Sequence, residues 1–459
     1  MKQEYFFTSS QIEQIRDGAL DILAEIGVKF GRADSAGKLA AKGFRVSADF
    51  VRIDRQTALK KIESQAGDGT PPPKQPFSAS LSAYPHTYEN TDGSLSGITT
   101  ESNAAMGRFV ANAAQTLFPG TSIACPGHPQ DTPPELQFFR HAVNSFIWCA
   151  DFDPMEAVSL KSAPYYFELC EAMGKPVKGA PIYVASPLNI SGESLDIAIE
   201  HSGRLEHVYV SSMPCFGANT PLNLVAAYAQ TLAETVGGAV AYEALTGVPA
   251  SYGTNIFPFD FYDTSMPFGT PEKLLLEWTS MEVGARVGGG EYGGPWATDI
   301  HTNAPRCGIQ ACAEKASLTA AGALLGVTHF HTVGTLAMDE LFSPVQLLLD
   351  MEMLAHTQKI ADGMPNHGFD GDLLAEVREG LENSYIMSDR TIDNMRGYVW
   401  RPNFFTRKTF GSYTSKPFPA EIEQAREKAR RIMNMPPAWK ISDELEAEAE
   451  RIFEAARRA

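Results

Sequence analysis

The chain has 459 residues, of which 44% are hydrophobic, and its net charge is −17. This length suits a (β/α)8 barrel with additions or two to three ordinary domains, and the negative charge, without any stripe of lysine or arginine, argues against a nucleic-acid-binding protein. No apolar run approaches the ~18 to 20 residues of a membrane span, and the N-terminus lacks the pattern of a signal peptide, so a cytoplasmic location is expected.

Residues 1–75 predict an N-terminal helical extension. Ser10 offers an N-cap, and Glu13 stands three residues later, as a capping box requires. Apolar residues then recur at three- and four-residue steps until Gly27 ends the run. The proline-rich stretch DGTPPPKQP at 68–76 is the predicted boundary of this unit.

The rest of the chain predicts a barrel of parallel strands. Residues 76–118 resemble a strand and hairpin layer leading into it, and residues 391–459 predict an aromatic segment followed by C-terminal helices. Between them, at 119–390, short apolar runs alternate with candidate helices, which favours a (β/α)8 TIM-type barrel. The predicted strands lie at 121–127, 145–151, 180–186, 205–212, 249–255, 285–292 and 326–333, with an eighth inside 345–370.

A doubly wound nucleotide-binding fold is the alternative architecture. Its fingerprint G-x-G-x-x-G should follow the first strand and open a helix. The glycine-rich stretch of this chain, GGGEYGGPWATDIH at 288–301, comes late and has a different spacing, and no Walker-type GxxxxGK[ST] is present. The barrel is therefore the preferred prediction.

Chemistry-bearing residues gather at the predicted strand ends, where a barrel of this type carries its active site. The predicted strand at 285–292 and the residues directly after it supply Glu291, Tyr292 and Trp296. His329 and His331 are two residues apart on another predicted strand, so their side chains should point to the same side of the sheet. Aromatic rings beside a carboxylate suit a quaternary or protonated amine, because ring faces attract cations. Other strand ends add Phe216, Asn219 and Tyr252 to this predicted site.

Structural interpretations of the same residues stay open. Glycines permit tight turns and close packing, Trp296 can be a core residue, and His329 or His331 can be satisfied buried histidines. Zinc would need three or four converging ligands, and no local spacing motif supports it, so no bound metal is predicted. A G-x-S-x-G elbow for acyl chemistry is absent. The six cysteines are predicted to be reduced thiols.

Several segments in order resemble the trimethylamine methyltransferase family, whose members pass a methyl group from an amine to a corrinoid protein. The opening helix SQIEQIRDGALDILAEIGVKF and the stretch VTHFHTVGTLAMDELFSPVQLLLDMEML at 327–354 carry the resemblance, which covers nearly the whole chain. Further matching segments are CPGHPQDTPPELQ (125–137), SSMPCFGANTPLNLVAAYAQTLAETVGG (211–238), GVPASYG (247–253) and TIDNMRGYVWRPNFFTR (391–407).

This resemblance implies a (β/α)8 fold and a methyltransferase activity. The chain has no pyrrolysine, so it resembles the non-pyrrolysine branch of the family, some members of which demethylate glycine betaine and related quaternary amines. Glu291 would then be the counter-charge and His331 or His329 would contact the betaine carboxylate, with Arg306 as another candidate. The corrinoid would be supplied by a partner protein, and the enzyme is expected to be a homo-oligomer. A zinc-dependent corrinoid methyltransferase and a non-catalytic amine-binding barrel are the alternatives.

Overall fold

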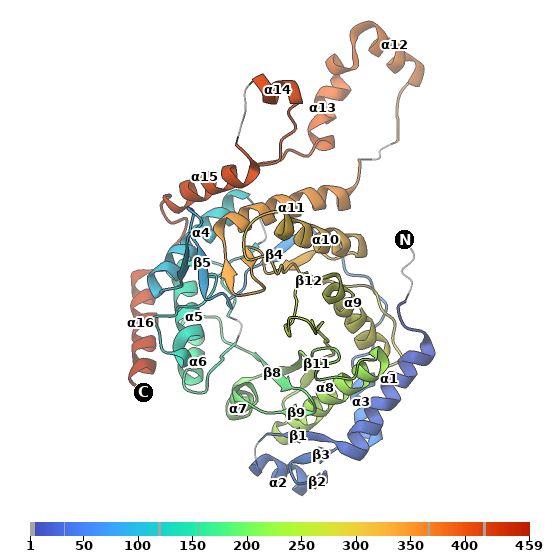
Figure 1. The fold of residues 1–459 in the computed structure, drawn as a ribbon, viewed down its shortest axis with the longest axis vertical. Coiled ribbons are helices and arrows are strands. Elements are labelled where there is room, and N and C mark those ends of the chain that lie inside the picture. Colours follow the sequence, from blue (N-terminus) through green and yellow to red (C-terminus); the bar gives the residue numbers. More distant parts are fainter. Residues whose placement is uncertain (1–4, 32, 118–120, 155, 366–367, 416–418) are drawn as a thin grey trace.

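The computed structural model describes residues 5–31, 33–117, 121–154, 156–365, 368–415 and 419–459 of this mixed α/β protein (Figure 1). Its helices are α1 (Ser9–Asp21), α2 (Ala33–Ala41), α3 (Arg55–Glu63), α4 (Thr100–Leu117), α5 (Gln137–Trp148), α6 (Ala163–Ala172), α7 (Glu193–Glu200), α8 (Leu224–Thr246), α9 (Pro271–Arg286), α10 (Ile309–Leu325), α11 (Pro344–Asp362), α12 (Leu373–Asn383), α13 (Asp389–Tyr398), α14 (Phe410–Ser415), α15 (Glu421–Met433) and α16 (Asp443–Arg458). Its strands are β1 (Val28–Phe30), β2 (Arg45–Ser47), β3 (Phe50–Arg52), β4 (Ser78–Ser80), β5 (Thr87–Glu89), β6 (Leu95–Gly97), β7 (Thr121–Ser122), β8 (Gly179–Ala185), β9 (Asn189–Ile190), β10 (His207–Ser212), β11 (Ala250–Gly253), β12 (Ala297–Asp299), β13 (His329–His331), β14 (Thr335–Leu336) and β15 (Leu341–Phe342).

The N-terminal unit is only partly helical. Helix α1 is present, but its capping box is formed by Thr8 and Gln11 rather than by Ser10 and Glu13. A π-helical turn, η1 (Ile22–Ile26), follows α1, and Gly27 ends it with a φ of 86°. The prediction of a purely helical extension is wrong, because β1, β2 and β3 form strands and β1 pairs in parallel with β9. These strands are three residues long, too short to show a period of two.

The largest sheet has seven strands in the order β11-β10-β8-β9-β1-β3-β2. Strands β8, β10 and β11 are mutually parallel, as predicted for the runs at 180–186, 205–212 and 249–255. Helix α8 packs on this sheet, and both belong to one hydrophobic core with α1. The buried carboxylate of Glu234 on α8 accepts hydrogen bonds from the Leu188 N–H at 2.9 Å and the Ser186 hydroxyl at 2.7 Å, which ties the helix to the β8–β9 turn.

A second sheet is wholly parallel and has the order β12-β13-β4-β7. Helices α4, α10 and α11 contribute to the hydrophobic core on its outer face. A small third sheet, β14-β15-β5-β6, lies beside it. In Figure 1 the labels β4 and β12 lie above the labels β8 and β11.

Two predicted strands are helical, and a third lies later in the chain. Residues 145–148 end α5, and the predicted eighth strand inside 345–370 is part of α11. A short apolar run cannot be distinguished by periodicity from a buried helix segment, which explains both errors. The run at 285–292 is the end of α9 and a turn, and the strand β12 starts only at Ala297. Among the described residues, no ladder joins β7 to β8 or β11 to β12, so a closed (β/α)8 barrel is not observed.

The C-terminal helices divide into two that pack on the body and others that project from it. Helix α15 contacts α4 and α11, and α16 contacts α5 and α6. Helices α12 and α13 extend away from the body at the top of Figure 1. Residues 391–398, where the predicted aromatic segment begins, are helical and belong to α13. None of the helices in the described ranges combines the length and apolar character that a bilayer span requires.

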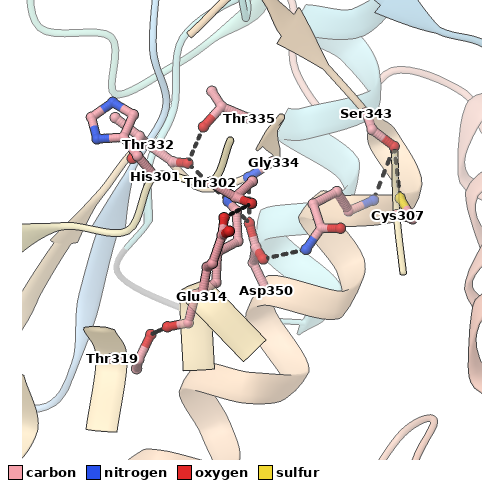
Figure 2. Close-up of polar contacts among 12 residues, drawn as sticks. His301, Thr302, Cys307, Glu314, Thr319, Thr332, Gly334, Thr335, Ser343 and Asp350 are labelled. Atoms are coloured by element: carbon pink, nitrogen blue, oxygen red, sulfur yellow. Dashed lines mark hydrogen bonds and ion pairs between the residues drawn. The ribbon is translucent and has the colours of Figure 1, made fainter. Parts of the chain in front are cut away.

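A buried ion pair lies between α10 and α11. The Lys315 ammonium group is 2.7 Å from an Asp350 oxygen, and both side chains are fully buried. Asp350 also accepts hydrogen bonds from the Gly334 N–H and the Gln346 amide, each at 2.7 Å (Figure 2). The pair therefore connects the two helices to the loop that follows β13. Because both charged groups are buried, removing either one would leave the other uncompensated, which costs much of the free energy of unfolding.

Replacing Asp350 by asparagine should leave the Lys315 ammonium buried without a counter-charge. We expect Asp350→Asn to lower the free energy of unfolding by about 3 to 5 kcal/mol, measured by urea denaturation. The Lys315→Met/Asp350→Leu double variant should lose less than Asp350→Asn, because no charge is then left unpaired. Glu135→Gln breaks an exposed pair with Lys161 and serves as the control, with a much smaller loss than Asp350→Asn. An equally small loss in Asp350→Asn would contradict this account of the pair.

Candidate active site

Strand β13 presents two histidines to the interior of the molecule. His329 and His331 lie on the same side of the strand with ring centroids 4.5 Å apart, which confirms the prediction from their spacing. Phe330, between them, points to the opposite side and packs against Phe77 in the core. The strand therefore has one face for packing and one face for chemistry.

Serines of the neighbouring strand β4 hold both rings. The Ser78 hydroxyl is 2.7 Å from His329 Nδ1, and the Ser80 hydroxyl is 2.7 Å from His331 Nδ1. Burial, together with the neighbouring His331, lowers the pKa of His329 to about 4. Burial also lowers the pKa of His331, although Asp299 opposes that shift. Both imidazoles are therefore neutral at neutral pH. Where the hydroxyl donates to Nδ1, Nε2 carries the proton and can donate to a ligand.

Asp299, at the end of β12, is the register partner of His331. Its carboxylate is 3.0 Å from the ammonium group of Lys273, which also lies 2.7 Å from Glu277. Burial by itself would raise the pKa of Asp299, but Lys273, His301 and His331 lower it below its usual range. Asp299 is thus an ionised carboxylate whose charge is already compensated by a lysine of the same chain.

The loop after β12 supplies a third histidine, His301. Its Nε2 is 3.0 Å from an Asp339 oxygen, and its ring lies 4.8 Å from that of Phe268. The segment that carries Asp339 has unusual backbone geometry, with positive φ angles at Ala337 (49°) and Met338 (63°). Such conformations persist only where the surrounding structure enforces them. Here, backbone hydrogen bonds from these two residues to Ala304 and Thr302 do so.

Tyrosines line the inner faces of β8 and β10. Tyr183 and Tyr209 alternate along their strands with the buried residues Ile182 and Val210. The two rings are 42% and 41% exposed, respectively, so they offer aromatic surface that packing does not use. A side chain at Gly253 on β11 would lie 1.8 Å from the Tyr209 hydroxyl. The glycine therefore provides the space that the tyrosine occupies.

Glu156 lies beside these tyrosines in a segment that precedes β8. Both of its carboxylate oxygens accept hydrogen bonds from the Tyr183 hydroxyl at 3.0 Å, and one accepts from Tyr84 at 3.5 Å. Glu156, Tyr183 and Tyr209 line a cleft of about 810 Å3, which Lys175, Lys178 and His207 also line. Burial raises the pKa of Glu156, and burial with the charges of Glu156 and Asp339 raises the pKa of Tyr84 to about 12. Within the described part of the chain, no lysine, arginine or histidine forms an ion pair with Glu156.

The glycine-rich stretch lies before β12 and not after a strand. Glu291 is exposed, and its N–H donates to the Gly67 carbonyl at 2.8 Å. A Cβ at Gly290 would be 2.3 Å from the Gly67 oxygen, and one at Gly293 would be 2.1 Å from the Thr70 oxygen. These glycines therefore permit close backbone approach to residues 67–70. The prediction that Glu291 lies at a strand end is wrong, because the glycine-rich stretch lies against residues 67–70 instead of following a strand.

The remaining predicted site residues have different environments. Trp296 is 63% exposed, and its ring lies edge-on to His331 at 6.3 Å, so the structure does bring these two together. Tyr252 is buried in the core, and its hydroxyl donates to the Ile62 carbonyl. Asn219 accepts a hydrogen bond from the Cys215 N–H at 2.6 Å and so closes a turn. Phe216 packs against the core and Tyr292 is half-buried.

Sequence reasoning missed Tyr84, Glu156, Tyr183, Tyr209 and Asp339. The tyrosines had a usable signal, since PIYVAS and HVYVSS each place one polar aromatic residue among buried aliphatic ones. Glu156 had none, because its segment forms no strand and has no period. In the described ranges, no group of three or more His, Cys, Asp or Glu side chains could hold a metal ion. All six cysteines are free, as predicted.

The sequence profile of the trimethylamine methyltransferase (MTTB) family matches residues 167–459. The chain is 23% identical over 312 residues to the trimethylamine methyltransferase MttB1 of Methanosarcina mazei, a match that covers 67% of this chain and 58% of that protein. The corresponding protein of Methanosarcina acetivorans is 24% identical, with 53% of this chain and 49% of that protein covered. The chain thus spans about half to three fifths of these relatives' length.

Another relative matches along most of both chains. The glycine betaine methyltransferase of Desulfitobacterium hafniense is 22% identical over 437 residues, which covers 89% of this chain and 88% of that protein. Among solved structures, the monomethylamine methyltransferase of Methanosarcina barkeri is 11% identical with a TM-score of 0.46, over 94% of this chain and 88% of that one. A hydroxylamine complex of MtmB has a TM-score of 0.44 at 11% identity, over 92% of this chain and 93% of that one. Both scores are too low to assign the fold.

The packing of Tyr209 against Gly253 can be tested directly. Gly253→Ala places a methyl group where the tyrosine hydroxyl lies, and we expect it to lower the free energy of unfolding by about 1 to 3 kcal/mol. Tyr209→Phe combined with Gly253→Ala should lose less, because the hydroxyl is gone. Gly203→Ala, at a glycine with open space around it, is the matched control. Urea denaturation measures all three, and equal stability of the Gly253 and Gly203 variants would contradict this packing.

Proposed function

The chain belongs to the trimethylamine methyltransferase family, and we propose that it transfers a methyl group from a quaternary amine to a corrinoid carried by a separate protein. Glycine betaine or a related betaine is the proposed donor. The observation that carries this proposal is the carboxylate of Glu156, held between Tyr84 and Tyr183 in a cleft and paired with no cation of the described chain.

An uncompensated carboxylate between tyrosines suits a cationic ligand. Partial burial makes the ionised form of Glu156 costly, and a bound ammonium group would offset that cost. A quaternary ammonium group cannot donate hydrogen bonds, so its affinity must come from charge and from aromatic faces. Tyr183 and Tyr209 offer such faces in the same cleft. A ligand that carries an ammonium or guanidinium group with N–H donors would instead favour a site with several fixed hydrogen-bond acceptors.

The chemistry favours a quaternary rather than a neutral amine. The C–N bond of the donor breaks with its electron pair left on nitrogen, so a quaternary ammonium departs as a neutral tertiary amine. Co(I) of the acceptor supplies the pair that forms the new bond to the methyl carbon. The residues of this chain would bind the cation, exclude water and orient one methyl group toward the acceptor. A single partly buried carboxylate fits this task, because positive charge leaves nitrogen in the transition state.

In this proposal Glu156 has the role that the sequence assigned to Glu291. His331 and His329, neutral and fixed through Nδ1 by serines, would donate from Nε2 to the carboxylate of a betaine. The ring of Trp296, which lies edge-on to the ring of His331, would cover that histidine. The roles predicted for Phe216, Asn219, Tyr252 and Tyr292 stay predictions.

We also propose that the two parallel sheets are the walls of one barrel. The pairing inside the second sheet supports this, because β13, the last of its strands in chain order, pairs in parallel with β4, the first. Residues 149–154 and 156–158, which include Glu156, would then occupy the position of the missing strand between β7 and β8. An opening at that position would give a ligand access to Glu156.

Removal of the Glu156 charge tests the binding site. We expect Glu156→Gln to weaken glycine betaine binding roughly ten- to a hundredfold, as measured by calorimetry, because a partly desolvated charge contact is lost. Glu291→Gln removes an exposed carboxylate of the same type and should leave the affinity unchanged. The reverse outcome, with Glu291→Gln weakened and Glu156→Gln unaffected, would place the cation at the position that the sequence predicted.

The pH dependence of binding follows from the raised pKa of Glu156. The cation binds the ionised carboxylate, so the affinity should rise with pH through the pKa of Glu156, above the ordinary 4.5, and then level off. The raised pKa also stabilises the unliganded fold at low pH, and that contribution is lost as the pH rises through it. Glu156→Gln should therefore gain stability relative to the parent as the pH rises above the ordinary carboxyl pKa of 4.5. Melting curves and titrations that show no such pH dependence would contradict a partly buried, uncompensated Glu156.

The reaction itself is tested by the absorbance of cobalt. The full chain is mixed with a corrinoid protein reduced to Co(I) and with glycine betaine, and methylation of cobalt is followed spectroscopically. Glu156→Gln should slow the reaction at low donor concentration. Binding of betaine without any cobalt methylation would identify an amine-binding protein and overturn the proposed transfer. Activity that is lost on chelation and restored by zinc would favour the zinc-dependent alternative.

A further inference from the structure

The cleft beside Glu156 follows one face of two paired strands. Gly179 and Tyr183 are four residues apart on β8, so the shared side of the strand extends for about 13 Å between them. The register partner of Gly179 on β10 is His207, and Tyr209 lies two residues later on the same side. All four residues line the cleft. The cleft therefore runs along the strands, and its two ends can contact different parts of one elongated ligand.

One end of the cleft, here called the acidic end, carries a carboxylate and aromatic rings. Glu156 accepts hydrogen bonds from the Tyr183 hydroxyl at 3.0 Å. Tyr183 lies in the second half of β8, and both it and Tyr209 leave much of their rings exposed. The proposed function places the quaternary nitrogen of the donor at this end, because charge and ring faces are what such a group can use.

The other end, here called the basic end, lies where β8 and β10 begin. Lys175 and Lys178 precede β8, and the ring of His207 covers the first residue of that strand. The Lys178 ammonium group is compensated by Glu206 at 2.8 Å. The Lys175 ammonium group donates to the Phe152 carbonyl, and it forms no ion pair with any carboxylate of the described ranges. Lys175 is therefore a cation of this cleft whose charge the chain itself does not compensate.

We propose that Lys175 is a specificity-determining residue, which selects donors whose anionic group lies several bonds away from the quaternary nitrogen. This inference rests on the proposed function, which places the ammonium group at Glu156. A donor that lies along the strands carries its negative charge toward Lys175, with His207 as a second hydrogen-bonding group. In glycine betaine a single methylene separates the two charged groups, so its carboxylate stays near the nitrogen and is left to His329 and His331.

The charge of Lys175 is what distinguishes the longer donors. An ammonium group makes charge-assisted hydrogen bonds, which are stronger than those of a neutral imidazole. The bond to the Phe152 carbonyl uses one of its three donors, so the others can bind a ligand. Asp153 also lines the cleft, and within the described chain it forms no ion pair with Lys175. Its carboxylate repels an anionic group, so the attraction must come from the lysine.

The test compares trimethylammonium carboxylates with one, three and five methylenes, the first of which is glycine betaine. In calorimetric titrations of the full chain, at least one longer donor should bind about tenfold more tightly than glycine betaine, the effect of one added charge-assisted contact. Lys175→Met should abolish this preference and leave the affinity for glycine betaine unchanged, whereas Lys175→Arg should retain most of it. Glu156→Gln should weaken all three donors by a similar factor. Lys161→Met, at an exposed lysine outside the cleft, should change none of them.

Alkyltrimethylammonium ions of the same lengths, which lack the carboxylate, separate the effect of charge from that of apolar length. Their affinities should not depend on Lys175. A parent chain that binds glycine betaine as tightly as the longer donors would overturn the inference and leave the proposed function intact. A Lys175→Met variant that weakens all three donors equally would also overturn it, as would alkyl cations with the same length preference. Failure of every quaternary amine to bind would overturn the proposed function as well. Circular dichroism verifies that each variant is folded.

Discussion

Each short parallel strand of this protein must bury one face beneath helices, and this requirement determines what its other face can carry. On β13, Phe330 enters the core, so His329 and His331 are directed to the interior. On β8 and β10, Ile182 and Val210 enter the core, so Tyr183 and Tyr209 face the cleft. The candidate site residues are therefore the side chains on the strand faces that do not pack into the hydrophobic cores.

The two groups of candidate residues differ in how their charges are balanced. Beside His331, Asp299 is compensated by Lys273 within the same chain. Beside Tyr183, Glu156 accepts hydrogen bonds from hydroxyl groups, and none of the described residues forms an ion pair with it. A carboxylate that is internally paired maintains geometry, whereas an unpaired one can respond to a charged ligand. This contrast is why the proposal places the cation at Glu156.

Helix α16 differs from the helices of residues 368–399 in how its apolar side chains are used. The charges of α16 form local pairs, such as Arg451 with Glu448, while its apolar residues are buried against α5 and α6. Helices α12 and α13 also form an ion pair, between Arg390 and Glu376, but none of the apolar side chains at 368–399 is buried.

The sequence by itself determined the elements whose residues interact with near neighbours in the chain. The helix at Ser9–Asp21 and the shared side of His329 and His331 follow from periods of 3.6 and 2, which depend only on backbone geometry. The family resemblance also came from the residues, and the profile match at 167–459 confirms it.

Tertiary structure decided the rest, because the relevant contacts join distant segments. Glycines 290 and 293 approach residues 67–70, more than two hundred positions earlier in the chain, and no local pattern reveals such a contact. Residues 145–148 form the end of α5 rather than a strand, because they pack in a core shared with α16. Glu156 became the candidate counter-charge only because folding brought Tyr84 and Tyr183 to it. Local periodicity reports which face of an element is apolar, but only the fold decides which faces meet.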